Sequence, residues 1–152
     1  MTAPADHTNL PQIYVLNGPN LNLLGQREPE IYGRDTLEDI ERMTRRRAEE
    51  LGLAMVFRQT NHEGQLVDWL HEAHRQSARA VLLNAGAYTH TSIALLDAIR
   101  SIDPPVIEVH LSDPSTREAF RHHSYIGMAA VDVVKGFGAR SYLVALDRVA
   151  EL

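Results

Sequence analysis

The chain contains no cysteine, which excludes disulfide bonds, thiolate nucleophiles, iron–sulfur clusters and zinc sites built on cysteine. Lysine is almost absent as well, because Lys135 is the only lysine among 15 basic residues. A mechanism that runs through a lysine imine would therefore have to use Lys135. No apolar run approaches the roughly 20 residues of a membrane helix, and Met1–Gln12 lacks the basic and apolar segments of a signal peptide. These absences favour a cytoplasmic protein.

The rest of the composition is that of one compact domain. A length of 152 residues with 44% hydrophobic residues suits a single core, and a net charge of −5 gives no electrostatic reason to expect nucleic acid or an anionic membrane as partner. Residues 1–12 are rich in proline and small polar side chains, which predicts a flexible tail before a single domain over 13–152. The run Arg45-Arg46-Arg47 has acidic residues one helical turn away, which favours a salt-bridged solvent face.

Short apolar runs alternate with amphipathic helical patterns along the chain. The apolar runs are Ile13–Leu16, Leu53–Phe57, Ala80–Leu83, Val106–Leu111 and Val131–Val134. The helical stripes extend from Leu37 to Leu51, from Leu66 to Ser77, from Ser92 to Ile102 and from Tyr142 to Val149, with Thr36 or Asp35 as the first cap and Gly52 as the first stop. Apolar strands without alternation, separated by helices, are typical of a parallel sheet covered on both faces. The sequence predicts a five-stranded, doubly wound α/β domain.

One connection is much longer than an ordinary strand-to-helix loop. Residues 18–35 join the first strand to the first helix, and such a length indicates a lid or a binding loop. Ligands of open α/β sheets bind beyond the carboxyl ends of the strands, where the strand order reverses. We therefore expect the segments after Asn17 and Asn84 to meet Glu108, His110 and Ser112, which share one face of a strand. The result would be one small polar crevice beneath the lid.

The sequence gives little sign of nucleotide, flavin, hydrolase or metal chemistry. The chain has no Walker, G-x-G-x-x-G, G-x-S-x-G or H-E-x-x-H motif, and it lacks the phosphate-binding loop of a flavin protein and the aspartates of a phospho-receiver. A metal site on His62, His71 and His74 would lack a convincing carboxylate, so we favour surface histidines there. His90 and His110 follow predicted strands, which favours a functional role for both.

Asp97 interrupts an otherwise apolar helical run. A buried carboxylate needs a partner. The sequence leaves open whether Asp97 forms a cap or a core salt bridge, or whether it contacts a neighbouring subunit or a ligand.

Several strings together resemble the type II 3-dehydroquinate dehydratases, in register over about residues 12 to 150. They are Leu16–Gly25, Arg27–Pro29, Tyr32-Gly33, Gln59–Gly64, Asn84–Ser92, Glu108–Ser112, Arg117-Glu118, Phe120-Arg121 and Ser124-Tyr125. The resemblance implies a flavodoxin-like fold, no cofactor and a homododecamer arranged as a tetramer of trimers. It implies the dehydration of 3-dehydroquinate to 3-dehydroshikimate, the third step of the shikimate pathway. The same reaction in quinate breakdown, or a flavodoxin-like binding module, remains as the alternative.

The resemblance also implies roles for individual residues. Tyr32 would be the base that takes the C2 proton, with Arg27 beside it, Asn20 would hold a water that stabilises the enolate, and His110 would protonate the departing C1 hydroxyl. Asn84, His90, Leu111, Ser112 and Arg121 would bind the substrate, and Asp97 would reach the site of a neighbouring subunit. Glu108 would hold the His110 imidazole, by our own inference from the strand period. The chain departs from the family at Asp113, where asparagine is usual, and at Lys135, where the family is usually apolar.

Overall fold

The computed structural model describes residues 9–26 and 28–152, and its centre is one parallel sheet. The strands lie in the order β2-β1-β3-β4-β5. Their bounds are β1 Gln12–Asn17, β2 Ala54–Gln59, β3 Ala80–Asn84, β4 Val106–Val109 and β5 Asp132–Val134. This order is that of flavodoxin-like sheets, so the predicted fold class and the predicted single domain architecture are confirmed.

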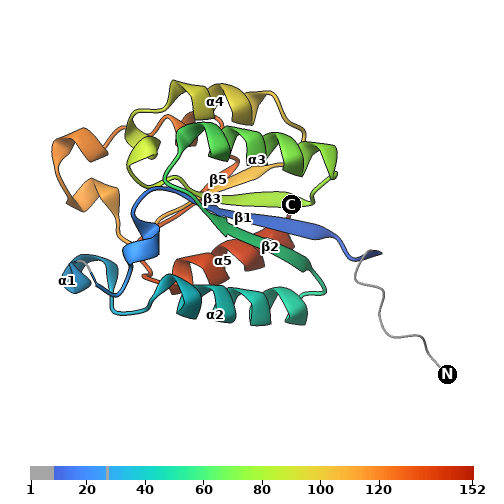
Figure 1. Ribbon diagram of the computed structural model, residues 1–152, viewed down its shortest axis with the longest axis horizontal. Helices are drawn as coiled ribbons and strands as arrows, with labels where there is room; N and C mark the ends of the chain where they lie inside the picture. Colours follow the sequence, from blue (N-terminus) through green and yellow to red (C-terminus); the bar gives the residue numbers. More distant parts are fainter. Residues whose placement is uncertain (1–8, 27) are drawn as a thin grey trace.

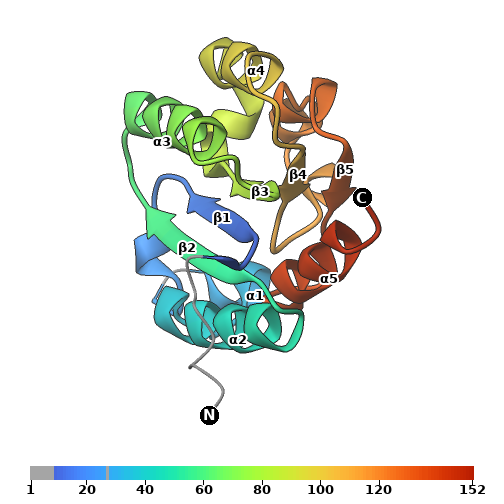
Figure 2. The ribbon, with the colours of Figure 1, turned by 90° about the vertical axis from the view of Figure 1, so that its right-hand side faces the viewer.

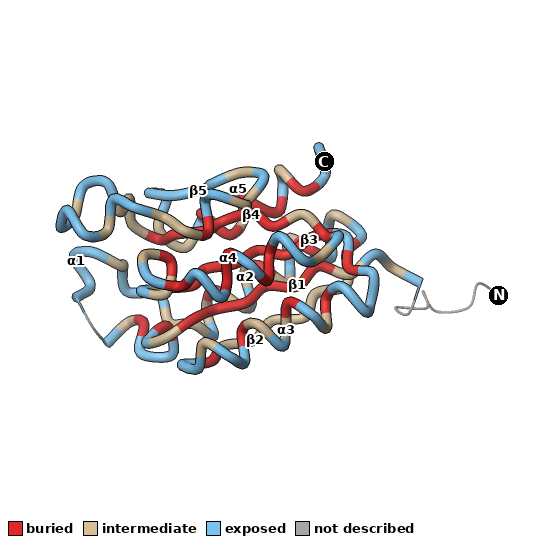
Figure 3. The backbone as a smooth tube through the Cα atoms, turned by 90° about the horizontal axis from the view of Figure 1, so that it is seen from above, coloured by how far each residue is buried: buried red, intermediate tan, exposed pale blue. Residues whose placement is uncertain are grey.

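Two helical layers sandwich the sheet (Figures 1 and 2). Helices α2 (Leu37–Glu50) and α5 (Arg140–Val149) cover one face, whereas α3 (Glu63–Arg75) and α4 (Ile93–Arg100) cover the other. Each layer has its own apolar core, one around Ile13, Val15 and Ile107 and one around Leu16, Val81 and Leu83. Figure 3 shows that the central strands are buried along their length. The continuous apolar runs of the sequence reflect this burial on both faces.

The first long helix begins and ends as its sequence predicts. Thr36 Oγ1 accepts a hydrogen bond from Asp39 N at 3.1 Å, and Asp39 Oδ2 accepts one from Thr36 N at 3.0 Å. This reciprocal pair is a capping box, which satisfies two donors that the helix itself leaves free. Gly52 follows the helix with φ of +73°, a left-handed conformation that favours glycine. The exposed face carries Arg45–Glu41 at 2.9 Å, as the charge spacing predicts.

The strand and loop bounds differ from prediction at several points. β1 already begins at Gln12, inside the range predicted as a tail, whereas residues 1–8 of that tail lie outside the described residues. β2 continues to Gln59 because it pairs with β1 as far as Asn17. β4 ends at Val109, not Leu111, because only the first amide beyond it, His110 N, still bonds to β5, at Val134 O. The connection 18–35 contains two short helices, a 3-10 turn at Leu21–Leu23 and α1 at Pro29–Tyr32. Among the described helices, none has the length and apolar character needed to cross a bilayer.

Candidate active site

A cavity of about 140 Å³ lies at the carboxyl ends of the central strands. The chain turns to opposite sides of the sheet after β1 and after β3, so this edge is the point where the strand order reverses. The cavity is lined by Pro19, Asn20, Leu21, Tyr32, Asn84, Gly86, Ala87, His90, His110, Leu111, Ser112, Pro114, Arg117 and Arg121. Eight of the ten site residues predicted from the sequence are therefore brought together, all except Arg27 and Asp97.

His110 lines the cavity, and Glu108 lies directly behind it, outside the cavity lining. Their side chains hydrogen-bond to each other through His110 Nε2 and Glu108 Oε2, and the residues are only 6% and 3% exposed. Ser124 Oγ donates to both Glu108 oxygens at 3.0 Å. A Cβ on Gly127 would come within 2.9 Å of Glu108 Oε1, so the backbone closes tightly over the carboxylate. The expectation that Glu108 would hold the imidazole is supported by this contact, which fixes the orientation of the His110 ring.

Tyr32, at the end of α1, also lines the cavity and lies under an arginine. The guanidinium carbon of Arg117 lies 5.0 Å from the centroid of the Tyr32 ring. The side chain of Arg117 is 14% exposed, and its Nε has no hydrogen-bond partner within the described part of the chain. Arg117 belongs to one of the family strings but has no role predicted from the sequence. The segment around it forms two short 3-10 turns, Pro114–Thr116 and Ala119–Arg121, so no helical spacing could have placed Arg117 at the site.

Three further residues are held in place by the loops around the cavity. The backbone of Asn20 is left-handed, with φ of 69°, and its N–H donates to Asn61 Oδ1 at 3.1 Å. His90 Nδ1 donates to His123 O at 2.8 Å, which leaves Nε2 as an acceptor when the ring is neutral. Burial lowers the pKa of His90 below its ordinary value, which favours that neutral form. Arg121 Nε donates to Glu118 Oε2 at 3.0 Å.

The cavity is suited to an anion. Its lining includes the two guanidinium groups of Arg117 and Arg121, and no aspartate or glutamate among the residues that the structure describes. Glu118 accompanies both arginines from outside the cavity and is half exposed. A carboxylate entering the site therefore meets positive charge and the backbone of Leu111 and Ser112.

Two predicted site residues are not part of this cavity. Arg27 lies outside the described residues. Asp97 is exposed on α4, so the core salt bridge considered for it is wrong. The run of apolar letters around Asp97 misled because the helix buries Leu96 and Ala98 on either side of it and turns position 97 outward.

The two departures from the family, Asp113 and Lys135, lie together. Lys135 Nζ is 3.7 Å from Asp113 Oδ1. Asp113 Oδ1 also accepts hydrogen bonds from Ser115 N and Ser115 Oγ at 3.0 and 2.7 Å. These bonds and the lysine hold the pKa of Asp113 below its ordinary value. The negative charge of Asp113, directly after Ser112 in the cavity lining, is thus partly neutralised by Lys135.

Comparison with known proteins decides the family. The family model for dehydroquinase class II matches residues 11–150. The chain belongs to this family. It is 58% identical to the 3-dehydroquinate dehydratase of Caulobacter vibrioides over 89% of this chain and 92% of that protein. It is 55% identical to the enzyme of the same name from Acidovorax ebreus over 91% and 97% of the two chains.

Solved structures of class II dehydroquinases have the same fold. The type II dehydroquinase of Butyrivibrio crossotus matches with a TM-score of 0.91 at 37% identity, over 93% of this chain and 98% of that one. The type II dehydroquinase of Propionibacterium acnes matches with a TM-score of 0.89 at 40% identity, over 93% and 97%. The resemblance that the sequence motifs indicated is confirmed.

Proposed function

We propose that this chain removes water from 3-dehydroquinate to give 3-dehydroshikimate, the third step of the shikimate pathway, in the cavity at the carboxyl ends of β1, β3 and β4. The observation that carries the proposal is a phenol and a carboxylate-supported imidazole that line one cationic cavity, in a class II dehydroquinase. The reaction is that of a hydro-lyase and uses the chain's own side chains as acid and base.

Tyr32 acts as the base in this proposal. A proton next to a ketone needs a strong base, and a tyrosinate is one, although a free tyrosine ionises only near pH 10. A guanidinium close to the ring favours the phenolate over the phenol. Arg117 already faces Tyr32, and Arg27 is the second arginine that the family string assigns to this task. Removal of the C2 proton leaves an enolate, whose oxygen receives a hydrogen bond from Asn20, directly or through a water.

His110 acts as the acid. The C1 hydroxyl leaves only when a proton reaches its oxygen, and an imidazolium can supply that proton near neutral pH. Glu108 balances the positive charge of His110 before the transfer. As the C1–O bond breaks, the electron pair of the enolate forms the C1–C2 double bond. The product is a conjugated enone, and the transferred protons end on Tyr32 and in water.

The remaining residues bind the substrate. Arg121 and the backbone of Leu111 and Ser112 receive its carboxylate or hydroxyls, whereas Asn84 and His90 hydrogen-bond its hydroxyls from the wall of the cavity. These groups fix the ring so that the C2 proton faces Tyr32 and the C1 hydroxyl faces His110. Such positioning removes much of the entropic barrier of the reaction.

The assembly belongs to the same proposal. Asp97 and Ile93 lie one turn apart on the exposed face of α4, and Ile93 is 55% exposed. Other large apolar side chains, Phe120, Met128 and Val131, are also more than half exposed, and apolar surface of this kind marks contacts between subunits. We propose a homododecamer in the cytoplasm in which Asp97 reaches a neighbouring site. Sedimentation of Asp97→Ala should show a smaller species, and an unchanged profile would remove Asp97 from the interface.

Ultraviolet absorbance tests the reaction itself. Addition of 3-dehydroquinate to chelator-treated protein should raise the absorbance of the conjugated enone, and His110→Asn should abolish the rise. His71→Asn, on the exposed side of α3, is the matched control and should retain full activity. Borohydride added with the substrate should not inactivate the enzyme, because inactivation would indicate an imine on Lys135. Absence of any absorbance rise in the wild-type chain would overturn the proposal.

A further inference from the structure

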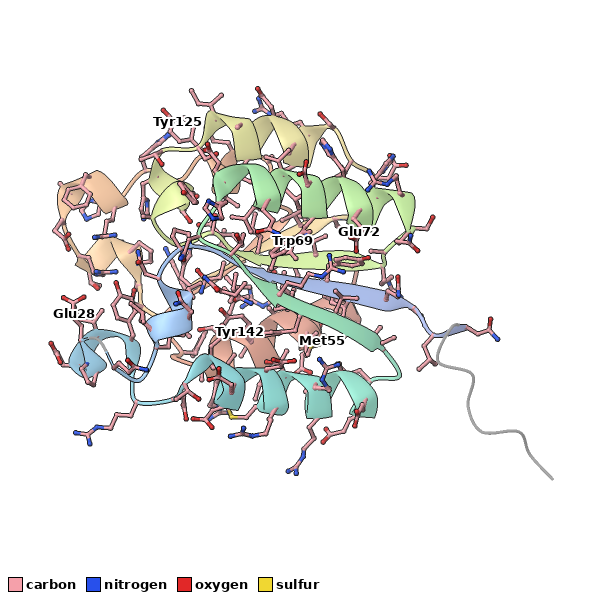
Figure 4. The ribbon with its side chains drawn as sticks, in the orientation of Figure 1. Glu28, Met55, Trp69, Glu72, Tyr125 and Tyr142 are labelled. Atoms are coloured by element: carbon pink, nitrogen blue, oxygen red, sulfur yellow. The ribbon has the colours of Figure 1, made fainter. Side chains whose placement is uncertain are left out.

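A buried tyrosine connects the cavity to the far side of the sheet. Tyr142, in the first turn of α5, is fully buried between the sheet and its helical cover (Figure 4). Its hydroxyl donates to Asn17 Oδ1 at 2.6 Å and accepts from Asn84 Nδ2 at 2.9 Å. Asn17 and Asn84 are the last residues of the neighbouring strands β1 and β3, and Asn84 lines the cavity. Tyr142 itself does not line the cavity.

The hydrogen bonds from Arg58 through Asn17 and Tyr142 to Asn84 can run in only one direction, which the carbonyl of Arg58 determines. Asn17 Nδ2 donates to the backbone carbonyl of Arg58 at 3.0 Å, and a carbonyl can only accept. Asn17 must therefore turn its oxygen toward Tyr142. The hydroxyl has one proton, which this oxygen takes, so the hydroxyl can only accept from Asn84. Burial raises the pKa of Tyr142 above its ordinary value, so the hydroxyl keeps its proton near neutral pH.

The amide oxygen of Asn84 supports the same orientation of its side chain. Gly86 N donates to Asn84 Oδ1 at 3.3 Å. A flipped amide would set its NH2 group against the Gly86 N–H and its oxygen against the oxygen of Tyr142. The orientation seen leaves one N–H and one oxygen lone pair of Asn84 free for the cavity.

We propose that Tyr142 is a positioning residue for substrate binding, which holds the Asn84 amide in the one orientation that presents this donor and acceptor. The inference rests on the proposed role of Asn84 in binding the substrate. It assigns a function to a buried residue on α5 that the acid and base chemistry does not use. The hydrogen bonds that orient the Asn84 amide start at the carbonyl of Arg58 on the edge strand β2. They run through Asn17 on β1 and Tyr142 on α5 to Asn84 at the cavity.

A purely structural role predicts a different result, and the chain offers a matched control. Tyr14 is also buried, 2% exposed, and its hydroxyl donates to Glu72 Oε2 at 2.7 Å on the α3 face of the sheet. Tyr14→Phe and Tyr142→Phe each remove one buried hydroxyl and one or two hydrogen bonds. Both should lower the melting temperature, whereas only Tyr142→Phe should affect binding.

The experiment is steady-state kinetics with 3-dehydroquinate on the full chain, with circular dichroism and thermal melting of each variant. Tyr142→Phe should raise KM about fivefold, as expected for one lost hydrogen bond, with kcat within about twofold because the acid and base are untouched. Tyr14→Phe should leave KM unchanged. Asn84→Ala should raise KM at least as much as Tyr142→Phe, and the double variant should match Asn84→Ala alone, since the two residues act through one group.

Each result has one meaning. An unchanged KM in Asn84→Ala would refute the proposed role of Asn84. If Asn84→Ala raises KM but Tyr142→Phe does not, the positioning role is overturned. It is also overturned if Tyr142→Phe raises KM by the same factor in the Asn84→Ala variant as in the wild type. Asn17→Ala provides a second route that keeps Tyr142. It frees the hydroxyl to donate to Asn84, so it should raise KM as Tyr142→Phe does, and an unchanged KM there would also overturn the inference.

Discussion

The two sides of the cavity are built in opposite ways. The floor consists of residues at or just beyond the strand ends, where Asn84 and His110 are 4% and 6% exposed and are hydrogen-bonded to the buried Tyr142 and Glu108. The lid side consists of α1, a four-residue helix with no buried residue. Glu28, at its start, has a left-handed backbone with φ of 39° and projects from the edge of the molecule (Figure 4).

The difference shows how the protein separates stability from chemistry. Groups on the floor lie at strand ends or directly beyond them and are buried, so a substitution there disturbs the fold and the site together. Tyr32, on the lid side, is only partly buried, with its ring packed against one core, so removal of its hydroxyl alone should disturb the chemistry more than the fold. The acid is therefore fixed in place by folding, whereas the base is brought by an element that packs weakly. The following predictions test this division, from the largest expected effect to the smallest.

Tyr32→Phe should show the clearest separation. Loss of the phenol removes the base, and we expect kcat to fall by about a thousandfold or more, within the range for general bases. The melting temperature should stay within about 2 °C of the wild type, because phenylalanine keeps the ring that packs against the core. Absorbance of the product and thermal melting give both values. Substantial residual turnover would remove Tyr32 as the base, and a large fall in melting temperature would contradict the division between lid and floor.

Glu108→Gln should alter both properties at once. Glutamine keeps the shape but cannot balance the charge of a protonated His110, so kcat should fall by about a hundredfold. The buried contacts with His110 and Ser124 should weaken, and the melting temperature should fall. Ser124→Ala is the control, since it removes a neighbour of the carboxylate and keeps the charge, and its effect on kcat should be much smaller. Equal effects of the two variants would mean that the charge of Glu108 is not used.

The floor was predictable from the sequence because it follows from strand periodicity. Glu108 and His110 are two positions apart and share a face, so their contact follows from the pleat. The cavity follows from strand order, since βα loops at a reversal point leave a crevice. The one local error on the floor, the length of β4, left Glu108 and His110 together all the same.

The lid side and the outer surface were less predictable, for physical reasons. α1 lies in a loop of prolines and glycines with no hydrophobic period, so nothing local indicated a helix. Arg117 reaches Tyr32 across more than 80 residues of sequence, and such a contact depends on tertiary packing alone. Of the alternatives left open for Asp97, the core salt bridge is wrong because the helix turns this residue outward, whereas the contact with a neighbouring subunit stays a prediction.

Arg117→Met tests the contact between the guanidinium of Arg117 and the ring of Tyr32 on the lid side. Methionine fills the space beside Tyr32 but supplies no positive charge to favour the phenolate, so kcat should fall by about tenfold. The kcat of Arg117→Lys should lie between those of the wild type and Arg117→Met, because an ammonium keeps the charge without the planar group. Stopped-time assays of product absorbance measure all three enzymes. Wild-type kcat in Arg117→Met would show that the cation over the ring has no part in the reaction.

Lys135→Met removes the positive charge that partly neutralises Asp113 near the cavity floor. Without the lysine, the carboxylate of Asp113 is less neutralised, and KM for the anionic substrate should rise about two- to threefold, the size expected of an exposed ion pair. High salt should reduce the difference. Addition of Asp113→Asn should restore the wild-type KM. A rise in KM that persists in the double variant would mean that Lys135 acts on the substrate directly.

His90 provides the smallest effect, in the pH dependence of stability. Burial lowers the pKa of His90 in the folded protein, so below about pH 6.5 the unfolded chain binds a proton at this residue more readily than the folded chain does. Stability is therefore lost as pH falls below that value. Arg121 and His110 act in the same direction as burial, whereas Glu108 and the carbonyl of His123 oppose it. His90→Gln should lose less melting temperature between pH 7.5 and pH 5 than the wild type, by about 1–2 °C, whereas the exposed His71→Gln should follow the wild-type slope. Identical slopes in all three proteins would mean that the cavity leaves His90 as easily protonated as a free histidine.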